Sequence, residues 1–469
     1  MRLLNHNERW SEAPGEGLNR GFRCFSKLTP LSDSLYNPLM WPARSLFLIG
    51  IFSFLVLSCA GTGRSQQRLH PSESGETAPT PLLSSPAVST PPLLSESPYR
   101  DIEKIEPGKI VHLPTGVEVS EKELIDLLAP ARIVYVGEVH DNIEDHRVEL
   151  EILKGLLARF PGKVSVGMEM FRRPAQAQLD QWVLGALDGK DFLKLWYENW
   201  GIDEVYYEAL LSFIRENKVP LIALNTPQEL EVKVGMKGLE GLSEEDQKRL
   251  PEIDRMDPYH RKALEAIFKG HGPQPGGLGP FYDVMLLWDE AMAETIARYL
   301  TSPEGSDKKM VVFAGGFHVG YGFGIPRRVF RRLPTPYQIV LPYTRDVPED
   351  KKGFMADVTS PYLPLMLADF VWGVGYREAP DKKGRLGVQI EPFQAGIRVA
   401  SVSPNSSAAD AGLQPGDIVV SFDGETLQEP FDLTYAVRQK SPGDRVKMEL
   451  IRDGKQIETE VTLKPSGHP

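Results

Sequence analysis

Cysteine is almost absent from this sequence of 469 residues, which contains only Cys24 and Cys59. A chain with so few thiols has no disulfide framework, so its stability has to come from a hydrophobic core. Long basic runs are missing too, and the 64 acidic side chains outnumber the 53 basic ones, giving a formal net charge of -11. This balance argues against nucleic acid as a partner, because binding to phosphates relies on clustered positive charge.

The most apolar segment, residues 45–57, has only thirteen residues, whereas a membrane-spanning helix needs about 20. Arg44 precedes it and Cys59 follows it, an arrangement typical of a signal peptide. The sequence Val56-Leu57-Ser58-Cys59 resembles a bacterial lipobox, which implies a lipid on Cys59 and a membrane as partner. Residues 1–59 are therefore interpreted as an N-terminal extension and a lipoprotein signal peptide.

The position of this apolar segment and the residue after Cys59 lead to two further expectations. About forty residues precede the apolar run, which is unusual for a signal peptide, and Met40 would give a conventional leader, so we expect translation to start there. Ala60 follows the lipidated cysteine in the place where Asp would favour retention in the inner membrane. We therefore expect a lipid-anchored protein of the cell envelope, at the outer membrane of a Gram-negative bacterium.

Composition divides the rest of the chain into three parts. Residues 60–99 are rich in Ser, Pro and Thr and read as a disordered linker, because they cannot bury enough surface to offset the entropy of ordering. Residues 100–378 alternate β-branched runs with amphipathic stretches, which predicts an α/β domain with a mostly parallel sheet flanked by helices. Strands are expected at 133–136, 164–167, 219–224, 310–314 and 338–341, and a wholly helical insert at 174–217. Residues 383–465 predict a small, mainly β domain.

Three of the expected strands end in ionisable residues. Their sequences are Gly137-Glu138-Val139-His140, Gly167-Met168-Glu169 and Gly315-Gly316-Phe317-His318. Ligands of open parallel sheets bind beyond the carboxyl ends of the strands, where the loops converge. We therefore expect these side chains to share one site.

The residue types of this site suit metal chemistry. His140 and His318 offer imidazole nitrogens, and Glu169 offers a carboxylate, a set that fits a zinc, manganese or iron ion. Glu138, if it is not itself a ligand, suits a general base that activates a metal-bound water. In an enzyme these four residues would be the catalytic ones.

The same motifs, with Gly324-Ile325-Pro326 downstream, resemble the ChaN-like haem-binding uptake family of the larger superfamily that includes Tiki, TraB and erythromycin-esterase-like proteins. The resemblance covers roughly residues 110–375. It implies two alternatives, because ChaN-like proteins bind haem, whereas Tiki-like relatives use paired Gly-x-x-His motifs and a Glu for metal-dependent proteolysis.

A haem site needs an apolar wall, an iron ligand and cations for the propionates. Aromatic residues crowd the helical insert, and tyrosine is an established axial ligand of haem iron; the candidates are Trp196, Tyr197, Trp200, Tyr206 and Tyr207. Arginine binds carboxylates through paired hydrogen bonds, and the candidates are Arg172, Arg173, Arg327 and Arg328. Two other histidines, His146 and His260, lie in polar helical stretches and are expected at the solvated surface.

The last part of the chain resembles bacterial PDZ domains. The resemblance rests on Arg385-Leu386-Gly387-Val388 and on the run from Ser403 to Val419, which contains Ala411-Gly412-Leu413-Gln414-Pro415-Gly416-Asp417. It implies that a peptide adds to the domain as an extra strand, with its terminal carboxylate at the backbone amides of Leu386, Gly387 and Val388. The expected partner is the C-terminus of another envelope protein.

Two functions follow from these features. The first is an envelope-anchored, haem- or iron-binding lipoprotein that recruits a partner through its PDZ module. The alternative is a metal-dependent hydrolase, a protease or an esterase of the Tiki-like type, with the PDZ groove recruiting its substrate. The sequence leaves open whether the protein is an enzyme.

Overall fold

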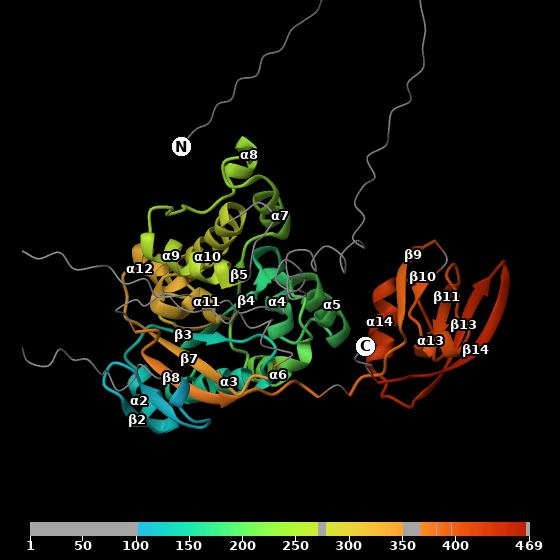
Figure 1. Ribbon diagram of the computed structural model, residues 1–469, viewed down its shortest axis with the longest axis horizontal. Coiled ribbons are helices and arrows are strands. Elements are labelled where there is room, and N and C mark those ends of the chain that lie inside the picture. The colour runs from blue at the N-terminus through green and yellow to red at the C-terminus, as the bar shows by residue number, and fades with distance from the viewer. Residues whose placement is uncertain (1–101, 271–277, 350–365, 381, 395, 466–469) are drawn as a thin grey trace, which may run out of the picture. The chain divides into compact units, whose positions relative to one another are not determined.

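The computed structural model describes residues 102–465 except 271–277, 350–365, 381 and 395 (Figure 1). The predicted signal peptide, Cys59 and the linker at 60–99 lie outside the described residues. Among the helices that are described, none is both long enough and apolar enough to cross a membrane.

An eight-stranded sheet forms the centre of the first domain, in the order β2-β1-β8-β7-β3-β6-β4-β5. The strands are β1 (Ile110–His112), β2 (Val117–Val119), β3 (Ile133–Glu138), β4 (Val164–Arg172), β5 (Leu221–Asn225), β6 (Lys309–Gly315), β7 (Tyr337–Arg345) and β8 (Phe370–Gly375). From β8 to β5 all neighbours are parallel, whereas β1 pairs antiparallel with both β2 and β8. The mostly parallel α/β fold that the sequence predicts is confirmed, and β1, β2 and β8 extend it at one edge.

Helices cover both faces of this sheet. They are α2 (Glu121–Leu128), α3 (Ile143–Arg159), α4 (Gln176–Val183), α5 (Gly189–Asn199), α6 (Glu208–Glu216), α7 (Gln228–Lys237), α8 (Glu244–Gln247), α9 (Pro258–Gly270), α10 (Leu278–Thr301), α11 (Gly316–Val319) and α12 (Ile325–Arg332). One core packs α2 to α6 against one face, and a second core packs α10 and α12 against the other (Figure 1). The central strands are therefore buried on both faces, which explains their nearly continuous runs of apolar residues.

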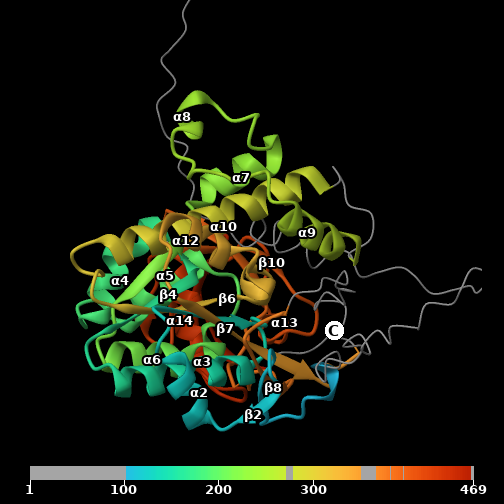
Figure 2. The same ribbon diagram turned by 90° about the vertical axis from the view of Figure 1, so that its left-hand side faces the viewer.

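The helices begin where side chains satisfy their free amides. Ser120 and Glu123 form a capping box at the start of α2, and the Asn142 side chain accepts a hydrogen bond from the Glu144 amide at the start of α3. The predicted insert at 174–217 is helical, with α4, α5 and α6 and the 3-10 turn η3 (Glu204–Tyr206). A separate small core joins α7 and α9 to α10, beyond the sheet (Figure 2).

The second domain is a small antiparallel sheet with two helices. Its strands follow the order β14-β13-β11-β10-β9, and β12 pairs with β11. The elements are β9 (Val388–Phe393), β10 (Gly396–Val402), α13 (Ser407–Asp410), β11 (Ile418–Phe422), β12 (Glu425–Thr426), α14 (Pro430–Arg438), β13 (Arg445–Arg452) and β14 (Lys455–Thr462). The domain has its own core, built around Ile397, Val399 and Phe422. The mainly β domain that the sequence predicts is thus present, with β9 as an edge strand.

Candidate functional site

Three adjacent strands carry the polar residues of the site. β6 lies between β3 and β4 and is parallel to both. Glu138 is the last residue of β3, Glu169 lies in the second half of β4, and His318 belongs to α11, which begins directly after β6. Because neighbouring parallel strands end at the same edge, the sheet brings these side chains together.

Glu169 lies between the two motif histidines. Its Oε1 is 3.4 Å from His318 Nε2, and its Oε2 accepts a hydrogen bond of 2.7 Å from the Gly315 amide. A Cβ atom at Gly315 would lie 3.1 Å from His140 Nε2 and 3.6 Å from Glu169 Oε2, so this glycine leaves the room in which the two side chains approach. All four residues that the sequence joined into one site therefore lie in one cluster.

Glu138 is the carboxylate of this cluster that contacts three neighbouring side chains. Its Oε1 accepts hydrogen bonds from Tyr207 Oη at 2.7 Å and from His140 Nδ1 at 2.5 Å. Its Oε2 lies 3.2 Å from Nδ1 of His146. Burial alone would raise the pKa of Glu138, but the charge of His146 and the hydrogen bond from His140 hold this pKa well below its ordinary value. Glu138 is therefore ionised, and it fixes the ring of His140.

His140 is the accessible member of the cluster. Its side chain is 31% exposed, whereas those of Glu138 and His318 are 0% and 7% exposed. The ring of Trp200 packs edge-on against the imidazole, with the ring centres 5.0 Å apart. Phe317, on α11, is 45% exposed. The entrance to the cluster thus combines an imidazole with aromatic surface.

A buried acidic residue that the sequence analysis missed orients His318. Asp289, on α10, accepts hydrogen bonds from His318 Nδ1 at 2.6 Å and from His260 Nε2 at 2.8 Å. Burial alone would raise the pKa of Asp289, but the two histidines lower it far below the ordinary value. With Nδ1 held by this carboxylate, His318 directs Nε2 at Glu169.

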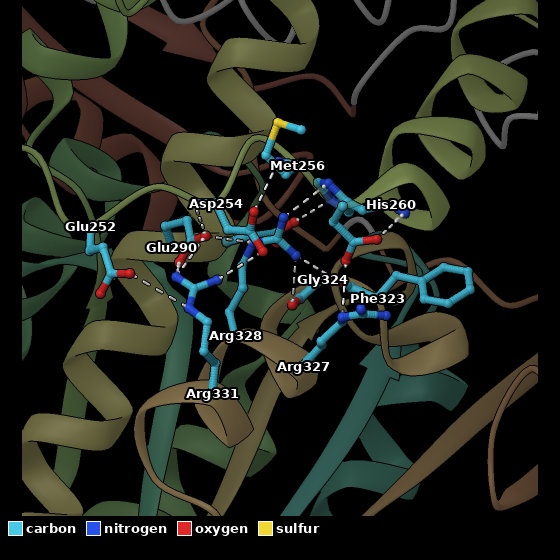
Figure 3. Close-up of polar contacts among 12 residues, drawn as sticks. Glu252, Asp254, Met256, His260, Glu290, Phe323, Gly324, Arg327, Arg328 and Arg331 are labelled. Atoms are coloured by element: carbon cyan, nitrogen blue, oxygen red, sulfur yellow. Dashed lines mark hydrogen bonds and ion pairs between the residues drawn. The ribbon is translucent and has the colours of Figure 1, made fainter.

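Arg328 contacts both His260 and Glu290 (Figure 3). Its guanidinium donates to His260 Nδ1 at 3.1 Å and pairs with Glu290 at 3.2 Å. An arginine side chain only donates, so His260 Nδ1 is the acceptor and its Nε2–H points to Asp289. Arg331 and Arg332 also contact Glu290, with closest distances of 3.0 and 2.6 Å.

The expectation that His146 and His260 lie at the solvated surface is wrong. Both residues are buried, at 3% and 2% exposure. Each pairs with a buried carboxylate, His146 with Glu149 at 2.9 Å and His260 with Asp289. Their polar sequence surroundings supply partners inside the protein and not contact with water. The spacing of His146 and Glu149, three residues apart on one helix, was an available signal for such a pair.

The aromatic candidates for a haem site occupy different environments. Tyr207 is fully buried, and its hydroxyl is hydrogen-bonded to Glu138. The Tyr197 hydroxyl donates to Glu204 at 2.6 Å. Tyr206 is partly exposed, with its ring centre 6.3 Å from that of His146. Trp196 is buried and donates to the Ile202 carbonyl. Trp200 is the aromatic candidate whose ring packs against the accessible imidazole of His140.

The arginines proposed for propionates already have partners. Arg172 pairs with Glu231 at 3.1 Å, and Arg173 pairs with Glu294 at 2.9 Å. Arg328 is 1% exposed and is held by Glu290. Arg327 pairs with Asp257 at 3.2 Å, but its side chain is 51% exposed. Of these four side chains Arg327 is the most open to a ligand.

The loop before β9 has the geometry of an anion-binding turn. Gly387 has φ of +79°, and a Cβ at this position would lie 2.2 Å from Ser406 Cβ, so only glycine fits. The carbonyls of Leu386 and Gly387 accept hydrogen bonds from Ala408 and Ser403. Among the described residues, no hydrogen bond is donated by the amides of Leu386 or Gly387. These amides, beside an edge strand, suit a terminal carboxylate.

Fold and site together define a protein with an α/β domain that carries a buried polar cluster and a second, small antiparallel β domain. Residues 124–329 match the family described as haem-binding uptake, Tiki superfamily, ChaN, and residues 384–463 match the PDZ domain family. The chain thus carries a ChaN-like domain of the Tiki superfamily, followed by a PDZ domain, as the sequence motifs had indicated.

Known proteins are similar to parts of this chain. The Arabidopsis thaliana protein RETICULATA-RELATED 5, chloroplastic, is 27% identical over 292 residues, which is 57% of this chain and 37% of that protein. The Escherichia coli periplasmic pH-dependent serine endoprotease DegQ is 33% identical over 156 residues, 33% of this chain and 29% of DegQ. The chain therefore spans about a third of the length of these curated relatives.

Among solved structures, a Campylobacter jejuni ChaN with cofacially bound haem is 16% identical with a TM-score of 0.43, covering 56% of this chain and 95% of that one. The HtrA3 PDZ domain bound to a phage-derived ligand is 24% identical with a TM-score of 0.17, covering 18% and 88%.

The contacts of His318 lead to a prediction on stability. Burial opposes its protonation, but Glu169 and Asp289 raise the pKa of His318 well above its ordinary value of 6.5. A histidine whose pKa is higher in the folded protein stabilises fully below the unfolded value, and this stabilisation is lost as the pH rises through the folded-state pKa. His318→Gln should therefore lower the free energy of unfolding by about 3–5 kcal/mol at pH 6, and by less at pH 10.

Urea unfolding of both proteins at the two pH values measures this difference. His112→Gln, a change at a partly exposed histidine of β1, is the control and should have little effect at either pH. Equal penalties for His318→Gln at pH 6 and pH 10 would contradict a charged imidazole between two carboxylates.

Proposed function

We propose that the ChaN-like domain binds haem at the carboxyl edge of its sheet. The observation that carries this proposal is the environment of His140. Its imidazole is accessible, Glu138 holds its Nδ1, and aromatic side chains lie beside it. A histidine held in this way by a carboxylate presents Nε2 to a metal. The description of the matching family as haem-binding supports the same function.

The residues present fit such a group. Trp200 Nε1 is buried and has no hydrogen-bond partner among the described residues. A polar group of a ligand would accept the hydrogen bond that this nitrogen can donate. Trp200, which packs against His140, offers apolar surface to a flat macrocycle, and Arg327, whose side chain is 51% exposed, offers a cation to a carboxylate. Haem, when bound, would supply an iron centre; His140 would hold the iron through its imidazole, and Trp200 would offer apolar surface.

Haem binding is tested by titrating the purified protein with haemin and following the Soret band. We expect saturable binding with a shifted Soret band for the wild type and a changed spectrum with about tenfold or more weaker binding for His140→Ala. His112→Ala is the control, because His112 lies on β1, away from the strands β3, β4 and β6 that carry the cluster. An unchanged titration for His140→Ala would remove His140 from the site, and absence of saturable binding to the wild type would refute the proposal.

A second candidate function is a metal-dependent hydrolase, and one observation favours it. His318 directs Nε2 at Glu169, and His140 faces the same carboxylate across Gly315. Two imidazoles and a carboxylate are a ligand set for a catalytic zinc, manganese or iron ion. In this arrangement the protein would use the metal to activate water for attack on a peptide or an ester. Metal-dependent hydrolysis by protein that takes up no haem would favour this candidate.

We further propose that the PDZ domain binds the C-terminus of another envelope protein. Three features support this mode. Gly387 has a positive φ, the amides of Leu386 and Gly387 donate no hydrogen bond among the described residues, and β9 is an edge strand. A peptide that adds antiparallel or parallel to β9 would gain main-chain hydrogen bonds, and its carboxylate would accept from the loop that ends at Val388. The domain would then place the haem-binding domain beside its partner.

Peptide amidation tests the carboxylate. A C-terminal peptide selected by the protein, for example from a random peptide library, should bind about tenfold or more weakly when its terminus is amidated, because the loop amides lose a charged acceptor. Fluorescence anisotropy with the full chain measures both affinities, and a peptide amidated only on an internal Glu is the control. Equal affinities for the free and amidated termini would refute terminal recognition.

We propose that Cys59 carries a lipid that anchors the protein to the outer membrane. The apolar segment at 45–57 and the lipobox-like residues before Cys59 support this. Cys59→Ser should move the protein from the membrane fraction to the soluble fraction, or leave it unprocessed, when cells are fractionated and probed by immunoblot. Ser65→Ala, a change in the linker after the lipobox, is the control and should leave the membrane partition unchanged. Unchanged membrane partition of Cys59→Ser would contradict the anchor.

A further inference from the structure

A second set of metal-type ligands lies deeper in the ChaN-like domain, behind Glu138. Glu138 ends β3, and His146 and Glu149 lie one turn apart on α3, so their side chains share one face of the helix. The side chains of Glu138, His146 and Glu149 are 0%, 3% and 0% exposed. One donor atom from each lies within 4.8 Å of the others. This set includes none of the three residues His140, His318 and Glu169.

The hydrogen bonds of His146 determine which of its nitrogens faces the carboxylates. Nε2 lies 3.2 Å from the backbone carbonyl oxygen of His140, a contact that requires a proton on Nε2. In a neutral imidazole Nδ1 then carries a lone pair. Nδ1 lies 2.9 Å from Glu149 Oε2 and 3.2 Å from Glu138 Oε2. Three acceptor atoms therefore converge in a buried space, which is unfavourable unless a positive charge lies among them.

Protonation of His146 does not give every buried oxygen of this set a hydrogen-bond partner. A protonated His146 would donate to Glu149, yet Glu138 Oε2 and Glu149 Oε1 are buried and have no hydrogen-bond partner among the described residues. Buried polar atoms without partners are rare in folded proteins and call for an explanation such as a bound ion. A single cation would interact with all three side chains at once.

We propose that Glu138, His146 and Glu149 bind one divalent transition-metal ion. The separations of 2.9 and 3.2 Å between donor atoms match the edges of a coordination polyhedron whose bonds are about 2.0–2.2 Å. One imidazole and two carboxylates favour zinc, manganese or ferrous iron over calcium, which prefers oxygen ligands alone. The described part of the chain contains no cysteine that would add a thiolate.

Neighbouring groups are arranged as a metal site requires. The Nε2–H of His146 donates to the His140 carbonyl, which fixes the ring with Nδ1 inward. Tyr207 donates to Glu138 Oε1 and leaves Oε2 for the ion, and its ring lies 4.0 Å from that of His146. Since Glu138 also holds His140, an ion at Oε2 would adjoin the proposed haem ligand without using it. The inference is independent of haem binding.

Zinc binding to haem-free, full-length protein tests the proposal. After chelation and addition of Zn²⁺, we expect one zinc per chain by elemental analysis after gel filtration. Glu149→Gln keeps the size of the side chain but removes its charge, and it should weaken zinc binding about tenfold or more. Glu151→Gln is the matched control, because Glu151 lies on the same helix but pairs with Lys154 near the surface, and its zinc binding should equal that of the wild type.

X-ray absorption at the zinc edge of the wild-type protein makes the test independent of whether any variant folds. One imidazole with oxygen ligands and no sulfur supports the proposal. Two imidazoles would place the ion between His140 and His318 and overturn it, as would sulfur ligands, the absence of zinc from the wild type, or undiminished zinc in a folded Glu149→Gln protein. Haemin titration of the same samples shows separately whether the protein binds haem, so failure of the zinc proposal and failure of the haem proposal can be told apart.

Discussion

Burial of acidic side chains at the carboxyl edge of the sheet is the constraint on which the first domain depends. In the described part of this domain eight carboxylates are no more than 5% exposed: Glu138, Asp145, Glu149, Glu169, Glu231, Asp257, Asp289 and Glu290. An isolated ionised carboxylate inside a protein is so unfavourable that it takes up a proton or finds a cation. His146 lies beside Glu138 and Glu149, His318 contacts Glu169 and Asp289, and arginines of α12 pair with Asp257 and Glu290. Removal of one of these cations leaves its carboxylates uncompensated.

Small residues make this density of charge geometrically possible. A Cβ at Gly137 would lie 2.2 Å from Leu341 Cδ2 and 2.9 Å from Val319 Cγ2, so β3 can approach α11 and β7 only without a side chain there. Gly315 does the same for His140 and Glu169. The glycines of the three motifs therefore determine distances between charges, and a methyl group at either position would push apart groups that compensate one another.

Much of the first domain could be predicted from the sequence, because parallel strands covered on both faces produce apolar runs that stand out. The strands that carry Glu138 and Glu169 were expected to within a few residues at their ends, and the rule for parallel sheets brought their carboxyl ends together. The short antiparallel strands β1 and β2 were missed, since three residues are too few to show an alternating pattern.

The inner part of the site was harder to predict. His260 and Arg328 meet across 68 residues of sequence, and nothing in a local pattern pairs them. Asp289 could have been noticed, because it adjoins Glu290 within the stretch from Val284 to Ala293 of α10, which is otherwise apolar, and buried charges need partners. His146 was assigned to the surface because polar neighbours in sequence suggested solvent. In the structure one of these neighbours, Glu149, is the buried partner of His146.

The contact between Arg328 and His260 limits how protons can move through the domain. A guanidinium keeps its protons at physiological pH, so His260 Nδ1, which accepts from Arg328, has no acidic neighbour from which to take one. A row of exchangeable protons that starts at His318 and crosses Asp289 therefore ends at His260. His140, which lies beside Gly315 with Glu169, is 31% exposed. The cluster therefore meets bulk water at the same imidazole that would receive the ligand.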